Sequence, residues 1–242
     1  MSEKNRLDKA CLAYIATRAK AQDAIKEGRV FVNQKQIKKP GFLVKETDEI
    51  YIEPKEENYV SRGAYKLKGA LDAFQINLED EIVLDIGAST GGFTQVSLQY
   101  GAKKVYALDV GHLQLDPILD ADARVIKMEG INARTITNSM FDEPIDFICM
   151  DVSFISCKTI LEVVFQEIQP KHLVCLIKPQ FECGPQYLNK HGVLKNEKIR
   201  DKVVQDVYNF IFSFYKNVKI MPSTIEGRSG NQEYLCIASE RR

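Results

Sequence analysis

Short apolar runs and segments of helical spacing alternate along the second part of the chain. The run IVLDIG, residues 82–87, is apolar at nearly every position, as is typical of a parallel strand buried on both faces. Similar runs occur further along, at residues 104–110, 124–130, 145–152 and 172–179. These runs predict the strands of one parallel sheet.

Helical segments lie between or beside these strands, at residues 64–74, 158–168 and 197–215. Such alternation predicts an α/β fold, a Rossmann-like doubly wound sheet with helices on both faces. Two last strands, within residues 218–227 and 232–239, are separated by a short connection. We expect them to form an antiparallel hairpin at one edge of the sheet.

The first part of the chain has a different pattern. RLDKACLAYIA, residues 6–16, has the apolar spacing of a helix. TRAKAQDAIKEG, residues 17–28, predicts a second helix, with Thr17 as its N-cap and Gly28 at its end.

Short strands are predicted after these helices, within residues 28–39 around an Asn-containing turn and within residues 41–54. Residues 1–54 are therefore predicted to be a small α+β domain. Residues 55–61 are polar and aperiodic and predict a linker, so the sheet domain is expected at residues 62–242.

Composition excludes several classes of protein. None of the apolar runs approaches the roughly 18 residues of a membrane span, and the first ten residues have no apolar signal core. We expect a soluble cytoplasmic protein without a membrane partner. The six cysteines form no CxxC pair and the three histidines are scattered, so no metal site is predicted.

Charge is distributed unevenly although the formal net charge is zero. Residues 1–45 carry eleven lysines and arginines against four acids, and residues 46–57 carry six acids against one lysine. A basic segment of this kind indicates a surface for RNA phosphates. The candidate RNA-binding residues are Arg6, Arg18, Lys20, Lys26, Arg29, Lys35 and, at the start of the sheet domain, Arg62. Each could also be a solvated surface charge.

The segment DIGASTGGFT, residues 85–94, predicts a strand end, a glycine turn and a helix start. It lacks the lysine of a phosphate-binding P-loop and does not fit the GxGxxG pattern of dinucleotide sites. Its carboxylate, Asp85, suits a cationic ligand such as S-adenosylmethionine, which carries an ammonium, a sulfonium and no phosphate. The candidate cofactor-binding residues of this segment are Asp85, Gly87, Ala88, Ser89, Thr90, Gly91, Gly92 and Phe93. The alternative interpretation is a simple helix cap.

Further cofactor contacts are expected where the next strands end. Asp109 ends the second strand, where an acid holds ribose hydroxyls in nucleotide-binding sheets of this kind. Glu129 and Asn132 follow the third strand, close to where an adenine would lie, and Asp151 follows the fourth.

Four polar residues stand where a pure core would not place them: Lys66, Asp151, Lys178 and Glu233. Asp151 and Lys178 follow apolar strands, at the sheet edge where doubly wound folds bind ligands. Taken alone, Lys178 could equally be a surface charge.

These motifs resemble a known family. SRGAYKL, DIGASTGGFT, the Asp of MDVSF, IKPQFE and the late EYL resemble the FtsJ-like ribose methyltransferases. The front section, with RLD and TRAKAQDAIKEGRVFVN, resembles the S4-like RNA-binding module. Together they are similar to the TlyA family of rRNA 2′-O-methyltransferases. The family's SRGG and VNG motifs are replaced here by SRGA and VNQ.

The resemblance implies S-adenosylmethionine-dependent methylation of a ribose 2′-hydroxyl in ribosomal RNA, with cytidine as the expected nucleotide and no metal. The family's Lys-Asp-Lys-Glu catalytic tetrad corresponds to Lys66, Asp151, Lys178 and Glu233. A lysine accepts a proton near neutral pH when burial or a neighbouring cation disfavours its charged form. Lys178 is the expected general base, Lys66 the neighbouring cation, Asp151 the group that orients Lys178, and Glu233 a positioning group.

Three other functions remain open from the sequence. One is an RNA-binding protein with an inert methyltransferase domain, against which the complete tetrad argues. A second is a membrane-active haemolysin, disfavoured by the lack of a membrane span or signal. A pseudouridine synthase shares the front module, but the glycine segment and the sheet pattern do not suit it.

Overall fold

The computed structural model describes residues 4–53, 59–227 and 230–242 of the chain. Their contacts divide the chain into two compact units, which meet in the sequence between residues 58 and 59. The predicted linker of residues 55–61 falls for the most part outside the described residues.

The first unit contains a helix that begins and ends as predicted. Helix α2 spans Arg18–Lys26, and the hydroxyl of Thr17 accepts a hydrogen bond from the backbone amide of Lys20 at 3.2 Å. Gly28 follows with a φ of +80°, a left-handed conformation that favours glycine. The predicted N-cap and helix end are confirmed.

The first predicted helix is shorter than expected. Helix α1 covers Leu7–Ala10 and continues as a 3₁₀ turn, η1, at Cys11–Ala13. Leu12 and Tyr14 are exposed, so an α-helix extended over them would gain little from burial. Lys4–Arg6 form a strand, β1, which has no sequence signal because its side chains are polar and exposed.

Small antiparallel sheets complete the first unit. Strand β1 pairs with β4, and β2 pairs with both β3 and β5. These strands are β2 Val30–Val32, β3 Lys35–Gln36, β4 Leu43–Lys45 and β5 Ile50–Ile52. Between β2 and β3, Asn33 and Gln34 have φ of 48° and 66°. Asn33 donates to Asp48 at 3.0 Å, and Gln34 takes the left-handed conformation in place of the usual glycine.

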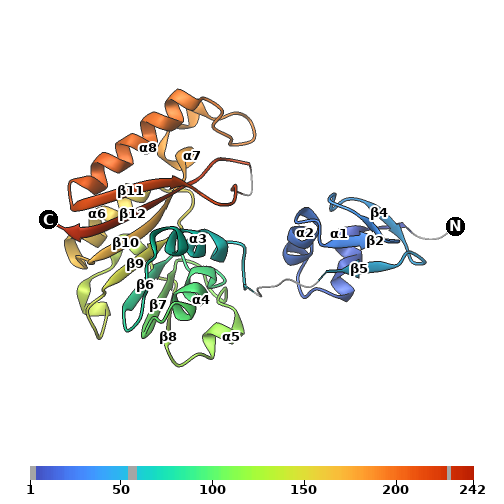
Figure 1. The fold of residues 1–242 in the computed structure, drawn as a ribbon, viewed down its shortest axis with the longest axis horizontal. Helices are drawn as coiled ribbons and strands as arrows, with labels where there is room; N and C mark the ends of the chain where they lie inside the picture. The colour runs from blue at the N-terminus through green and yellow to red at the C-terminus, as the bar shows by residue number, and fades with distance from the viewer. Residues whose placement is uncertain (1–3, 54–58, 228–229) are drawn as a thin grey trace. The chain divides into compact units, whose positions relative to one another are not determined.

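The second unit is built on a seven-stranded sheet in the order β11-β12-β10-β9-β6-β7-β8 (Figure 1). The strands from β10 to β8 run parallel, whereas β12 is antiparallel to both β10 and β11. The strands are β6 Ile82–Ile86, β7 Lys104–Asp109, β8 Val125–Glu129, β9 Phe147–Met150, β10 His172–Ile177, β11 Tyr215–Pro222 and β12 Tyr234–Arg241. The predicted parallel sheet and its antiparallel edge hairpin are confirmed.

Helices cover both faces of this sheet (Figure 1). Helices α3, α4 and α5 pack on the face that contains Val83 and Val105, and α6 and α8 pack on the face that contains Leu84 and Ile148. The helices are α3 Ala64–Phe74, α4 Gly92–Gln99, α5 Pro117–Asp120, α6 Cys157–Glu167, α7 Pro179–Glu182 and α8 Glu197–Phe212, with 3₁₀ turns η2 Ala133–Thr135, η3 Asn138–Met140 and η4 Pro185–Tyr187. The predicted doubly wound arrangement is confirmed.

The parallel strands place several predicted site residues at one edge of the sheet. Gly87 follows β6, Asp109 ends β7, Asp151 follows β9 and Lys178 follows β10. The connection from β11 to β12, residues 223–233, is longer than expected and brings Glu233 to the same edge. Among the residues that the structure describes, no helix combines the length and apolar character needed to cross a membrane.

Candidate active site

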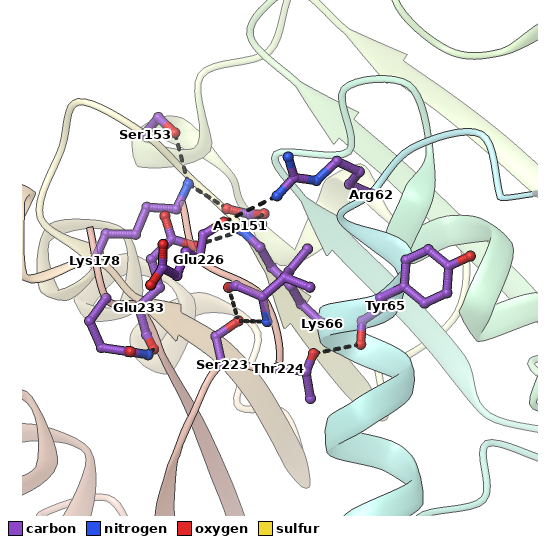
Figure 2. A network of polar contacts seen from close by, with 12 residues as sticks. Arg62, Tyr65, Lys66, Asp151, Ser153, Lys178, Ser223, Thr224, Glu226 and Glu233 are labelled. Carbon is purple, nitrogen blue, oxygen red and sulfur yellow. Dashed lines mark hydrogen bonds and ion pairs between the residues drawn. The ribbon is translucent and has the colours of Figure 1, made fainter. Parts of the chain in front are cut away.

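The structure brings the four predicted polar residues into one cluster. Lys66, in the first turn of α3, donates a hydrogen bond from Nζ to Glu233 Oε2 at 2.6 Å and lies 3.5 Å from Asp151 Oδ2. Lys178 Nζ lies 2.5 Å from Asp151 Oδ1. Figure 2 shows these side chains directed toward one another from four separate segments of the chain. Asp151 is thus shared by both lysines.

The cluster is withdrawn from water. Lys66 and Lys178 are 8% exposed and Glu233 is 3% exposed. Its two ammonium groups and two carboxylates balance formally, which is the condition under which buried charges are tolerated. Removing one member would leave a buried charge without compensation.

One further hydrogen bond holds the cluster in place, and a glycine lies close to its other side. Lys178 Nζ donates to Ser153 Oγ at 2.8 Å, a partner that the sequence analysis missed. Ser153 lies two residues after Asp151. Its polar side chain so close to the end of a strand could have indicated from the sequence that it belongs to the site. On the other side, a side chain at Gly227 would come within 2.6 Å of Glu233 Oε1, so the loop approaches the carboxylate closely.

The start of α3 is tied to the loop that carries Glu233. The Thr224 hydroxyl donates to the Tyr65 carbonyl at 3.2 Å, and Arg62 Nη2 donates to the Glu226 carbonyl at 3.3 Å. Both contacts are visible in Figure 2. They fix the first turn of α3, and with it Lys66, against the connection between β11 and β12.

The glycine turn lies directly against Asp151. Gly87 has a φ of +84°, and a side chain there would come 2.5 Å from the carbonyl oxygen of Asp151. Gly91 has a φ of +91° and packs on Leu115 and Leu119. Only glycine combines this backbone conformation with so close an approach. The turn therefore sets the distance between the loop after β6 and the strand that carries Asp151.

Two neighbouring cavities lie at this edge. The first, about 570 Å³, is lined by Gly87, Ser89, Asp109, Asn132 and Asp151 among others. The second, about 490 Å³, is lined by Ala88, Thr90, Gly92, Phe93 and the four cluster residues. Gly87, Ser89 and Asp151 line both cavities, so the glycine turn connects them. The structure thus brings most of the predicted cofactor residues together.

Asp109 fixes the glycine turn. Its Oδ2 accepts a hydrogen bond from the Ser89 amide at 2.8 Å, and its Oδ1 accepts one from the Gly111 amide at 2.7 Å. Asn132 lines the same cavity and caps the turn η2 by accepting from the Arg134 amide at 3.0 Å. Both residues, predicted from the sequence to contact a cofactor, line the first cavity.

Asp85 lies beneath the glycine turn and not on a cavity wall. Its side chain is fully buried, and Oδ2 accepts a hydrogen bond from the Thr94 hydroxyl at 2.7 Å. Its Oδ1 has no hydrogen-bond partner among the described residues. Burial raises the pKa of Asp85 to about 7, with the Asp151 and Asp109 carboxylates adding to the effect and the Thr94 hydrogen bonds opposing it.

Glu129 also differs in placement from what the sequence suggested. Its carboxylate accepts hydrogen bonds from the backbone amides of Leu113 and Gln114, both at 2.8 Å, and of Leu115 at 3.2 Å. These hydrogen bonds lower the pKa of Glu129, and the bond from the Gln114 amide has the largest effect. Its side chain therefore holds the loop after β7, and Gln114 of that loop lines the first cavity.

The candidate RNA-binding residues are divided between the two units. In the first unit, Arg6 and Arg18 both pair with Asp8, at 3.0 Å, and Arg29 pairs with Glu27 at 2.9 Å. Lys20, Lys26 and Lys35 are exposed. In the second unit, Arg62 lines the second cavity beside Lys66.

The site fits a cationic nucleoside cofactor. The first cavity is bordered by two carboxylates, Asp109 and Asp151, and by one cation, Arg134. A pyrophosphate would meet these carboxylates, whereas a sulfonium or ammonium group would be attracted to them. Among the described residues there is no group of three or more His, Cys, Asp or Glu side chains arranged to hold a metal ion.

Comparison with known proteins also indicates a methyltransferase, and the similarity covers nearly the whole chain. Residues 59–239 match the FtsJ-like methyltransferase family, and residues 5–50 match the S4 domain. Hemolysin A of Brachyspira hyodysenteriae is 43% identical over 92% of this chain and 93% of its own. The 16S/23S rRNA (cytidine-2′-O)-methyltransferase TlyA of Mycobacterium tuberculosis H37Rv is 38% identical over 90% of this chain and 83% of its own.

A solved structure from Streptococcus thermophilus, of a protein described as a hemolysin, is 37% identical. It covers 99% of this chain and 90% of its own, with a TM-score of 0.75. The sheet order and the polar site at its carboxyl edge define an S-adenosylmethionine-dependent methyltransferase. The chain belongs to the FtsJ-like methyltransferase family, and within it to the members with an S4 domain at the front, such as TlyA and hemolysin A.

Proposed function

We propose that this protein methylates the 2′-hydroxyl of a cytidine ribose in ribosomal RNA, and that it does so in the cytoplasm. The observation that carries the proposal is the buried Lys66–Asp151–Lys178–Glu233 cluster, which borders the cavity beside the glycine turn. The TlyA relatives, named as rRNA (cytidine-2′-O)-methyltransferases, support the substrate.

The cofactor would occupy the first cavity. Asp109 is suited to its ribose hydroxyls, Asn132 to its adenine, and the glycine turn to its methionine part. When bound, S-adenosylmethionine supplies an already activated methyl group. The protein therefore has to position the ribose hydroxyl and remove its proton.

Lys178 is the proposed general base. Its ammonium group forms an ion pair with Asp151 Oδ1 and donates a hydrogen bond to Ser153 Oγ, which together fix its position. A ribose hydroxyl would approach it from the second cavity, which Lys178 lines. A neutral Lys178 would accept the hydroxyl proton there.

The charge balance of the cluster favours this role. With both lysines charged, the formal charge of the four groups is zero. A cationic cofactor would add positive charge beside this balanced cluster, which favours a neutral general base there. Lys66 pairs with Asp151, and Glu233 holds Lys66 in place.

The decisive experiment is single-turnover methyl transfer to ribosomal RNA by Lys178→Ala and Lys178→Arg over a pH series. Both variants are expected to lose transfer while binding cofactor and RNA nearly normally, because the base acts on the barrier. Arginine keeps the positive charge but does not give up its proton. Lys198→Arg, at an exposed position of α8, is the matched control.

The wild-type rate should increase with pH, because a general base must be unprotonated to accept the hydroxyl proton. A near wild-type rate in Lys178→Arg would refute the general base and leave Lys178 an electrostatic guide at most. Mapping of ribose methylation in ribosomal RNA from cells with and without the protein identifies the nucleotide. Binding of cofactor and RNA without transfer would instead support an inert domain, and cell lysis without transfer would support the haemolysin alternative.

We also propose that residues 1–54 supply most of the RNA affinity, that residues 55–61 are a linker, and that residues 62–242 hold the cofactor. The division of contacts between residues 58 and 59 supports this arrangement. A fragment that begins at Ser61 should bind cofactor and lose most of its affinity for ribosomal RNA. Equal RNA affinity of the fragment and the whole chain would contradict the proposal.

A further inference from the structure

A single carboxylate organises two of the candidate RNA-binding arginines in the first unit. Arg6 donates from Nε to Asp8 Oδ1 and from Nη2 to Asp8 Oδ2, both at 3.0 Å. Arg18 donates from Nε and Nη2 to Asp8 Oδ2, also at 3.0 Å, and Gln22 Nε2 donates to the same oxygen at 2.7 Å.

Asp8 is covered by its own partners. Its side chain is fully buried, whereas the side chains of Arg6 and Arg18 are 44% and 48% exposed. The hydrogen bond from Arg6, the largest of several causes, holds the pKa of Asp8 well below its usual range. The carboxylate is therefore charged and screened from solvent, while both guanidinium groups reach the surface.

The cluster joins three elements and is held at its backbone. Arg6 ends β1, Asp8 lies in α1, and Arg18 begins α2. The Asp8 amide donates to the Pro40 carbonyl at 3.0 Å, and a side chain at Gly41 would come 3.1 Å from Arg6 Nη1. Neither arginine is free to move away from the other while these contacts persist.

The bonds to Asp8 use only part of each guanidinium. A guanidinium carries five N–H donors in a planar fork, and its remaining donors here lie on half-exposed groups. Two guanidinium groups around one carboxylate also leave an excess of one positive charge. Directed donors with net positive charge match the oxygens of a phosphodiester.

We propose that Asp8 is a positioning residue that fixes Arg6 and Arg18 as a paired binding site for an RNA phosphodiester. This inference rests on the proposed RNA-binding function of the first unit. In an ordinary structural ion pair, Asp8 would only stabilise the fold. In the proposed site, the geometry of the two arginines contributes to RNA affinity in addition to their charge.

A site that depends on charge alone and a site ordered by Asp8 predict opposite changes in RNA affinity for Asp8→Asn. Removal of a negative charge should strengthen RNA binding if charge alone matters. If Asp8 orders the arginines, the variant should bind RNA about three- to tenfold more weakly, because two side chains must be immobilised on binding. Glu46→Gln removes one negative charge from an exposed turn of the same unit and is the matched control.

The measurement is a filter-binding titration of full-length protein with a folded ribosomal RNA transcript over a salt series, with circular dichroism as the folding control. The wild type and Asp8→Asn should have the same salt dependence, because the number of cations is unchanged, and should differ in affinity. Affinity of Asp8→Asn equal to or above that of Glu46→Gln would overturn the inference. If the wild type itself failed to bind RNA, the proposed function would fail instead.

A second variant decides the case if Asp8→Asn does not fold. Arg18→Lys keeps the charge but cannot reproduce the planar fork. It should bind RNA several-fold more weakly with an unchanged salt dependence. Wild-type affinity in Arg18→Lys would refute the paired site.

Discussion

The buried carboxyl of Asp85 should reduce the stability of the sheet unit at neutral and alkaline pH, and Asp85→Asn should relieve this effect. The side chain is fully buried, with one oxygen bonded to Thr94 and the other without a partner among the described residues. Burial raises its pKa from the ordinary 3.8 to about 7. The unfolded chain therefore ionises near pH 4, and the folded chain only near pH 7.

The sign follows from proton linkage. Between pH 4 and 7 the folded state binds more protons at Asp85 than the unfolded state, so stability falls as pH rises through this window. A difference of about three pKa units corresponds to about 4 kcal/mol, an upper limit for the loss above pH 7. Asparagine keeps the shape but must bury an amide, so we expect a gain of about 1–3 kcal/mol at pH 8 and almost none at pH 4.

Urea unfolding followed by circular dichroism from pH 4 to 8.5 measures this difference, since the chain has no tryptophan. The transition that S-adenosylmethionine shifts identifies the sheet unit. Asp201→Asn, whose side chain is 74% exposed, is the control for loss of a carboxylate. A stability difference between wild type and Asp85→Asn that did not change with pH would refute the reasoning.

The same variant tests binding. Asp85 lowers stability and lies beneath a site for a cationic ligand. A residue that lowers stability in this way is expected to serve function. Calorimetry should therefore show weaker binding of S-adenosylmethionine by Asp85→Asn at pH 8, although the protein is more stable. Unchanged affinity would mean that Asp85 supports the turn and does not act on the ligand.

Three other residues give independent predictions. Gly87→Ala should lower the free energy of unfolding by about 1–3 kcal/mol and reduce both cofactor affinity and turnover, because the new side chain displaces the Asp151 carbonyl. Thermal unfolding measures the stability and calorimetry the cofactor affinity. A stable, active variant would contradict this prediction. Glu129→Gln should weaken cofactor binding several-fold without changing single-turnover rates at saturation, because it loosens the loop at Leu113–Leu115; an unchanged dissociation constant would argue against that role. Ser153→Ala should reduce the single-turnover rate about tenfold with little effect on cofactor or RNA binding, and Ser153→Thr should restore part of that rate. Equal rates for the wild type and Ser153→Ala across the pH series would exclude a role of Ser153 in orienting Lys178.

Local patterns predicted the elements of this fold well. Helix α3 has the bounds expected from its spacing, and Thr17 caps α2 as its type and position indicated. These features depend on residues close together in the chain. Strand β1 gave no signal, because its pairing with β4 depends on backbone contacts and not on apolar side chains.

The site was predictable in outline, because strand ends in a parallel sheet meet at one edge. The partners of each side chain were not. Arg6 and Arg18 share Asp8, and Glu129 turns to a loop about fifteen residues earlier. Sequence alone gives the chemical type of a residue, whereas the direction of its side chain is set by tertiary contacts of this kind.

Glu233 and Lys66 are separated by 167 residues, and their ion pair has a consequence for how the enzyme matures. Lys66, Asp151 and Lys178 are all synthesised well before Glu233, so the growing chain holds three of the four groups with an unbalanced charge. Contacts between such distant residues form late in folding. The four-residue cluster can therefore be completed only after translation has passed residue 233.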